Sequence, residues 1–176
     1  MAKPSKPAPV ADTLSPPQTD LSALPPRVAA LREKILEACD SGDIEKLRTP
    51  IEWSETPPSL TRDSVRPRGF GPIIDFLKTR SFDGAGAEWL GIARAVFSAP
   101  YVVQRRGAFT TYIWPAWARV PAETLADLPD AERMAMWACV RFADLRARAR
   151  DDRPLMQHAG LGPDGTWHYF WSVEPA

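Results

Sequence analysis

The sequence predicts an α+β domain in which four to five helices pack on a small antiparallel sheet of about four strands. Two patterns of hydrophobic spacing support this class. Apolar residues recur at helical spacing in several segments between residues 27 and 98, and two later segments alternate with the period of two that is typical of strands. Glycine and proline residues separate these segments, as expected at turns and boundaries. The length of 176 residues is sufficient for one such domain.

Four helices are expected before the first strand. Apolar spacing predicts a helix over 27–40, and a short helix is expected over 44–48, where Pro50 would stop it. Pro72 is expected to open a third helix, because proline is tolerated in a first turn. A fourth helix is predicted to end at about Ser98. Together these helices would supply one layer of the domain.

Two hairpins and a long helix follow. Alternating or β-branched residues predict strands over 101–105 and 109–114, joined by a short turn. A helix is expected over 130–148, since its first turn is acidic and its last turn is basic. The last hairpin is predicted over 155–161 and 166–173, around a Gly-Pro-Asp-Gly turn.

Two segments are expected to lie outside regular structure. Residues 1–26 hold seven of the 19 prolines and no aromatic residue, so we expect an extended or disordered arm before a single domain at 27–176. Residues 51–70 are predicted to form a long ordered loop wrapped on that domain. Ile51 and Trp53 would anchor the loop.

Composition excludes several classes of protein. The 22 basic residues balance 22 acidic ones, which argues against a protein that coats nucleic acid or an anionic membrane. No apolar run approaches the ~20 residues that span a bilayer. We therefore expect a soluble cytoplasmic protein, or an exported one if Met1 replaces a removed signal peptide. Cys39 and Cys139 are expected to be buried reduced thiols, and a bridge between them is the lesser alternative.

The sequence carries no recognised catalytic motif. It has no phosphate-binding loop, nucleophile elbow, zinc-binding helix or calcium loop. With only His158 and His168 available, a metal site is not expected, because a catalytic zinc needs more ligands. We expect no cofactor. The sequence favours a protein without enzymatic activity and leaves an enzyme open.

Aromatic residues on the two hairpins raise an alternative. They could line a pocket for a small molecule between sheet and helices, although packed core is the usual role of such residues. Whether they share a face depends on the register of the last hairpin, since a slip of one residue reverses every side chain. The candidate ligand-binding residues are Tyr112, Trp114, His158, Tyr169 and Trp171.

Arginine clusters raise a weaker alternative. Arginine accounts for 17 of the 22 basic residues, and local runs could bind anions or nucleic acid, although nucleic acid is not expected from a neutral chain. A further run of arginines lies within 141–153. The candidate anion-binding residues are Arg62, Arg66, Arg68, Arg105 and Arg106.

Several segments together resemble a family of uncharacterised bacterial proteins. The resemblance implies a single domain, and it supplies no reaction and no catalytic residue. It extends from about Leu24 to Val173. The segments that carry it are 41–52, 56–58, 81–84, 112–115 and 162–167.

The leading hypothesis is a non-enzymatic domain that acts through protein contacts, as an accessory subunit. It rests on the lack of a catalytic motif and on the proline-rich arm, which could become ordered on a partner. The sequence does not identify the partner or the oligomeric state.

Overall fold

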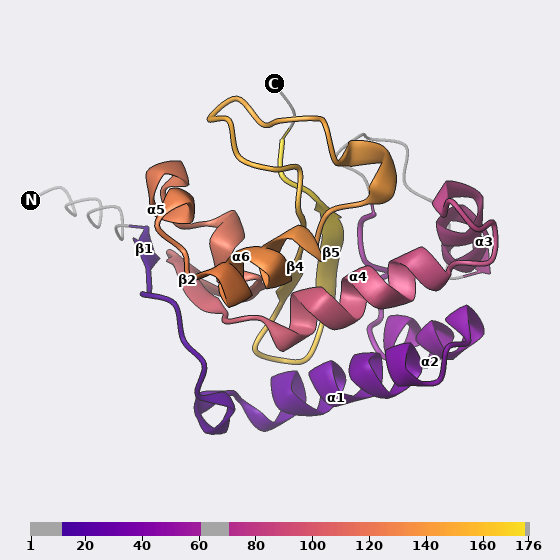
Figure 1. Ribbon diagram of the computed structural model, residues 1–176. Coiled ribbons are helices and arrows are strands. Elements are labelled where there is room, and N and C mark those ends of the chain that lie inside the picture. The colour runs from indigo at the N-terminus through magenta and orange to yellow at the C-terminus, as the bar shows by residue number, and fades with distance from the viewer. Residues whose placement is uncertain (1–11, 61–70, 175–176) are drawn as a thin grey trace, which may run out of the picture.

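The computed structural model describes residues 12–60 and 71–174, and it has the expected α+β class (Figure 1). Its sheet is antiparallel, with its strands in chain order. It has five strands where about four were expected, because the N-terminal segment contributes one. The strands are β1 (Thr13–Leu14), β2 (Val102–Arg106), β3 (Phe109–Trp114), β4 (Gln157–Leu161) and β5 (Trp167–Ser172).

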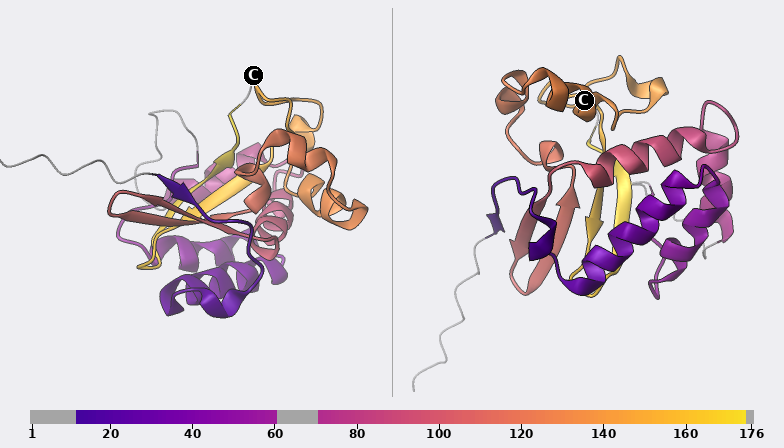
Figure 2. Two further views of the ribbon diagram at one scale, coloured as in Figure 1. Left: turned by 90° about the vertical axis from the view of Figure 1, so that its left-hand side faces the viewer. Right: turned by 60° about the horizontal axis from the view of Figure 1, so that its bottom comes forward.

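The longer helices form a layer on this sheet, and shorter helices and 3₁₀ turns lie around it. Helices α1 and α4 lie side by side, and α4 contacts β4 (Figure 2). The α-helices are α1 (Pro26–Asp40), α2 (Arg48–Glu52), α3 (Gly71–Arg80), α4 (Ala87–Ser98), α5 (Ala122–Ala126) and α6 (Asp130–Trp137). The 3₁₀ turns are η1 (Leu21–Ala23), η2 (Ile44–Leu47), η3 (Ala116–Ala118) and η4 (Phe142–Asp144).

The core lies between α1, α4 and one face of the sheet. Large aromatic side chains fill it. The ring centroid of Phe97 lies 5.7 Å from that of Trp114 and 5.8 Å from that of Trp167. Tyr101 packs on Trp114 at 5.0 Å. A smaller cluster on the other face is built around Ile113, so β3 is covered on both sides.

Short segments cover both edges of the sheet. On one edge, Thr13 pairs with Arg105 in β2, and Gln18 exchanges backbone hydrogen bonds with Tyr101. On the other edge, the N–H of Ser59 donates to the carbonyl of His168, and Ser59 accepts from the N–H of Phe170. These segments occupy backbone groups that an exposed edge would offer to another chain.

Part of the predicted arm over 1–26 is attached to the domain. Backbone groups between Thr13 and Gln18 bond to the segment 101–105, whereas residues 1–11 lie outside the described residues. Thr13–Leu14 is extended, as expected, but it is paired with β2. The Ser15 hydroxyl also accepts a hydrogen bond from the N–H of Val103. A low apolar content did not leave this segment unattached, because backbone pairing along an open strand edge holds it.

The prediction of a helix over 130–148 is wrong. Helix α6 ends at Trp137, and the chain then turns to meet the start of β4. The N–H of Gln157 donates to the carbonyl of Cys139, and Val140 pairs with Met156. These non-local bonds compete with continuation of the helix. Beyond the end of α6, Cys139 and Val140 are buried, but Phe142 and Leu145 are exposed.

Two smaller expectations also fail. Pro50 does not stop a helix but lies in the first turn of α2, where its missing N–H has no helical partner to lose. Trp53 is 52% exposed and so is not a buried anchor, whereas Ile51 is buried as expected. The second half of the predicted 51–70 loop lies outside the described residues.

Both cysteines are buried and free, which agrees with the leading expectation for them. Burial raises the pKa of Cys39 to about 11 and that of Cys139 to about 12. Neither thiol is therefore a candidate nucleophile at neutral pH.

None of the helices within 12–60 and 71–174 has the length and apolar character needed to cross a membrane.

Candidate functional site

The five aromatic candidates for a ligand site do not lie on one face of the sheet. Tyr112 and Trp114 pair with Leu161 and Ala159, so they face the helices with the core. The other three candidates lie on the opposite face of the sheet, because neighbouring strand residues alternate. Those three are His158, Tyr169 and Trp171. The pocket that the sequence suggested between sheet and helices is thus not assembled from these residues.

On the helix side the aromatic residues are core. Trp114 is fully buried between Phe97 and Tyr101. Tyr112 packs partly buried against the same cluster, with its ring 6.4 Å from that of Tyr101. This outcome matches the usual role of such residues beneath helices.

On the other face, His158, Tyr169 and Trp171 form a ring cluster. Tyr169 stacks on Trp171 with centroids 4.6 Å apart and planes 11° apart, and it meets His158 edge-on at 5.2 Å. Gly160 makes this possible, since a Cβ there would lie 2.3 Å from the Tyr169 ring. His168 is exposed. No three His, Cys, Asp or Glu side chains in the described part of the chain are grouped to hold a metal ion.

The anion-binding candidates are not gathered into one site either. Arg62, Arg66 and Arg68 lie outside the described residues. Arg105 and Arg106 lie exposed at the far end of β2, and as strand neighbours they point to opposite faces. Arg106 pairs with Asp12 of the N-terminal segment, Nε to Oδ2 at 3.3 Å.

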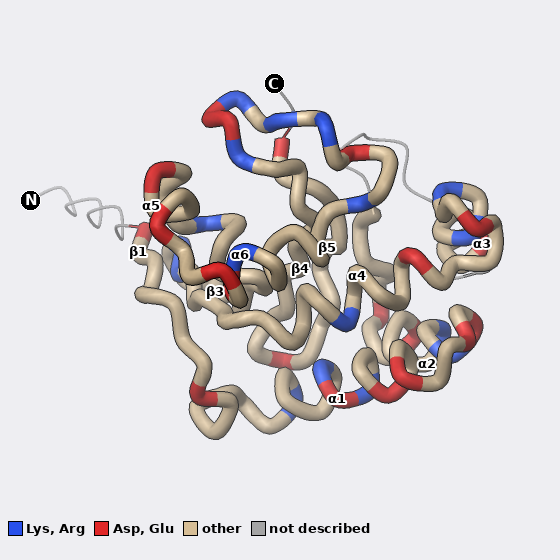
Figure 3. The backbone as a smooth tube through the Cα atoms, in the orientation of Figure 1, with Lys and Arg blue, Asp and Glu red and all other residues tan. Residues whose placement is uncertain are grey.

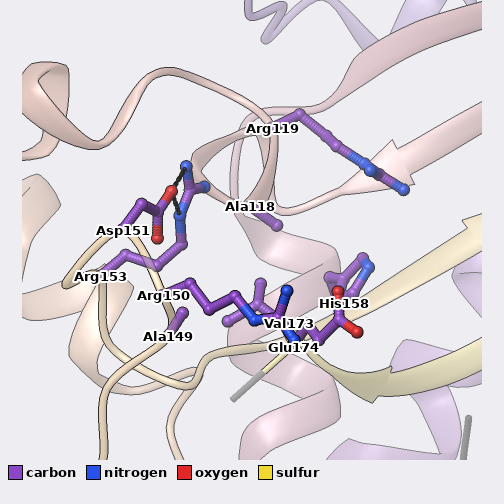
Figure 4. Close-up of a pocket in the computed structure, with 9 residues that line it drawn as sticks. All are labelled: Ala118, Arg119, Ala149, Arg150, Asp151, Arg153, His158, Val173 and Glu174. Atoms are coloured by element: carbon purple, nitrogen blue, oxygen red, sulfur yellow. Dashed lines mark hydrogen bonds and ion pairs between the residues drawn. The ribbon is translucent and has the colours of Figure 1, made fainter. Parts of the chain in front are cut away.

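A different group of charged residues lines an open cavity of about 300 Å³ (Figure 4). Of the sequence candidates for a site, His158 is among its lining residues. Two more lining residues, Arg150 and Arg153, belong to the arginine run within 141–153 that the sequence shows. Nothing in the sequence indicated Arg119. The lining residues are Ala118, Arg119, Ala149, Arg150, Asp151, Arg153, His158, Val173 and Glu174.

Arg153 holds one wall of this cavity together. Its guanidinium donates to Asp151, Nε to Oδ2 at 2.7 Å, and to the carbonyls of Trp117 at 3.2 Å and Val120 at 3.1 Å. The hydrogen bond from Arg153 holds the pKa of Asp151 below its ordinary value. One side chain thereby ties the loop after η4 to the segment after η3.

A second surface feature is a pair of exposed phenylalanines from distant segments. Phe82 follows α3 and is 73% exposed, and Phe142 in η4 is 69% exposed. Their ring centroids are 5.9 Å apart. Leu145 lies three residues after Phe142, and side chains at this spacing in a 3₁₀ turn lie on the same face. We call Phe82, Phe142 and Leu145 the phenylalanine patch.

One carboxylate binds the backbone of both phenylalanines of this patch. Glu88, in the first turn of α4, accepts from the N–H of Phe82 at 3.0 Å through Oε2 and from the N–H of Phe142 at 2.7 Å through Oε1. Arg141 adds a further link, since it donates to the carbonyl of Arg80 at 2.7 Å and lies over the Trp89 ring. The patch is therefore exposed and rigidly supported.

Asp83 braces the same turn. Its carboxylate accepts hydrogen bonds from the Ser81 hydroxyl and from the N–H groups of Ala85, Gly86 and Ala87 at the start of α4. The bond from Ser81 is the largest of the contributions that lower the pKa of Asp83. A carboxylate with a lowered pKa stabilises the fold above its ordinary pKa, and this stabilisation is lost as the pH falls through the folded-state pKa.

We expect Asp83→Asn to lower the free energy of unfolding at pH 7 and to matter less at pH 3. Denaturant unfolding of both proteins at the two pH values would measure this. Asp127→Asn is the control, because the Asp127 carboxylate makes no hydrogen bond to a described residue. An equal difference from the wild type at both pH values would contradict the prediction.

No protein-family model, curated protein or solved structure was found to match this chain. The resemblance to uncharacterised bacterial proteins therefore stays a prediction.

Proposed function

We propose that this chain is a non-enzymatic interaction domain that binds a partner protein at the phenylalanine patch. The observation that carries the proposal is that Glu88 holds both Phe82 and Phe142 in an exposed position. Large exposed apolar groups that cluster on a surface mark interaction sites. A patch that is already ordered also costs less entropy to bind than a mobile one.

The charges around the patch favour a particular partner. Basic residues lie on α3 and along the 141–153 loop (Figure 3), and Arg80 and Arg146 among them are exposed. The acids beside the patch are already occupied: Asp83 and Glu88 accept from backbone N–H groups, and Asp144 pairs with Arg141 at 3.8 Å. We infer that the partner offers an apolar anchor flanked by carboxylates, because charge complementarity directs encounter and fixes register.

Photocrosslinking would test this proposal. A photoreactive phenylalanine analogue is placed at position 82 or, separately, at position 109, in cells that naturally make the protein. Phe109 is a matched control, since it is 78% exposed but lies at the start of β3, away from the patch. We expect position 82 to capture one protein that position 109 does not. Capture of the same proteins from both positions would contradict the proposal.

Affinity measurements on the purified pair would then establish specificity. We expect Phe142→Ala to weaken binding of the captured partner by at least about tenfold, since aromatic anchors carry much of an interface energy. Phe109→Ala should leave the affinity unchanged. Glu88→Ala should weaken binding while both rings remain, because the two backbone segments that carry the rings lose their shared acceptor. An unchanged affinity for Phe142→Ala would overturn the assignment of the patch.

We propose a cytoplasmic location and relatives among uncharacterised bacterial proteins. Two buried free cysteines support a reducing compartment. The described residues give no support to the aromatic pocket as a ligand site, since Tyr112 and Trp114 are packed in the core or against it.

A further inference from the structure

The cavity of Figure 4 lies where three distant segments meet. Arg119 follows η3, Arg150 belongs to the loop before β4, and His158 lies within β4. The Arg150 side chain points toward Val173 and Glu174, which follow β5 (Figure 4). The cavity is built by residues other than those of the phenylalanine patch, so a ligand site in it is independent of the proposed partner site.

The charges of the cavity do not cancel internally. Arg153 and Asp151 neutralise each other in a close ion pair. The guanidinium groups of Arg119 and Arg150 make no hydrogen bond or ion pair with any residue in 12–60 or 71–174. Among the described residues that line the cavity, Glu174 is the one other acid. The described lining therefore holds two arginines and one carboxylate outside the Arg153–Asp151 pair, and their balance is positive.

Arg119 is the more informative of the two arginines. Its Nε is buried, and no acceptor among the described residues meets it. Leaving a buried donor unsatisfied costs about 1–3 kcal/mol, and more for a charged group. An anion in the cavity would supply the missing acceptor, and a guanidinium matches the paired oxygens of phosphate or carboxylate.

We propose that this cavity binds a small ligand through an oxyanion group, phosphate or carboxylate, with Arg119 and Arg150 as its anchors. The volume of about 300 Å³ is at the lower end for small-molecule sites, so the ligand is small. Glu174 is expected to oppose a bare anion. It also gives the natural ligand a place to put a hydrogen-bond donor beside its anionic group.

Titration calorimetry with inorganic phosphate and, separately, with malonate at constant ionic strength tests the site. We expect saturable binding of at least one of them, and the stronger of the two identifies the anionic group. Arg119→Gln and Arg150→Gln should each weaken binding by about tenfold or more. Arg146→Gln is the matched control, an exposed arginine of the same loop that does not line the cavity.

Glu174→Gln gives a test in the opposite direction. Removing this carboxylate should tighten phosphate or malonate binding, because it removes a repulsion without removing a donor. Thermal melts would show whether each variant is folded. If Arg119→Gln does not fold, Arg150→Gln still tests the site, because Arg150 is exposed. Failure of both anions to bind would overturn the proposal. An equal loss in Arg146→Gln would also overturn it, since that result indicates diffuse attraction.

Discussion

Trp114→Ala is expected to lower the free energy of unfolding by about 3–5 kcal/mol, the largest effect on stability that we predict for a single substitution. Trp114 is fully buried in β3, and its ring contacts those of Phe97 and Tyr101. Truncation removes this apolar burial and leaves a cavity that the surrounding rings can fill only in part.

Denaturant unfolding followed by far-ultraviolet circular dichroism would measure the loss. Trp53→Ala is the matched control, because Trp53 is 52% exposed, and it should cost less than about 1 kcal/mol. If Trp114→Ala does not fold, Trp114→Phe should fold with a smaller loss. Equal losses for the two Ala variants would mean that Trp114 does not hold the core as described.

The elements that could be predicted from the sequence are those that local spacing specifies. Helix α1 was expected over 27–40 and is found over Pro26–Asp40. The β2–β3 hairpin was also placed within a residue or so, at Val102–Arg106 and Phe109–Trp114. In each case the apolar period and the flanking proline or glycine favour the same structure, so tertiary contacts did not need to override them.

The elements that could not be predicted depend on partners far along the chain. Helix α6 ends at Trp137 because Cys139 and Val140 bond to the start of β4. Strand β1 forms because β2, about 90 residues later, offers an open edge with which it can pair. The proline-rich sequence around β1 does not predict this pairing. The spacing of apolar residues within a short stretch of sequence therefore predicts neither the end of α6 nor the pairing of β1.

The candidate site was missed for a related reason. Glu88 looks like an ordinary first-turn acid of α4, yet it accepts from Phe142, 54 residues away. Arg119 has no arginine beside it in the sequence, and only folding brings it to the cavity that Arg150 also lines. The aromatic candidates were separated by strand alternation, which the residue types alone do not reveal.

Arg153→Ala is expected to cost about 2–3 kcal/mol, the second-largest stability effect. The Arg153 side chain is 11% exposed and donates to Asp151 and to the carbonyls of Trp117 and Val120. Its removal leaves those acceptors without their donor. Arg153→Lys should rescue little, because an ammonium cannot reproduce the planar fork. Arg133→Ala is the control, since its ion pair with Asp130 is local and exposed.

The pH dependence of this loss separates the ion pair from packing. Arg153 lowers the pKa of Asp151, so their pairing stabilises the fold above the ordinary carboxyl pKa and fades as the pH falls below it. The difference between wild type and Arg153→Ala should therefore shrink from pH 7 to pH 3, and a constant difference would assign the loss to packing alone. Because Arg153 joins the two segments that carry Arg119 and Arg150, its removal should also weaken phosphate or malonate binding in a protein that remains folded.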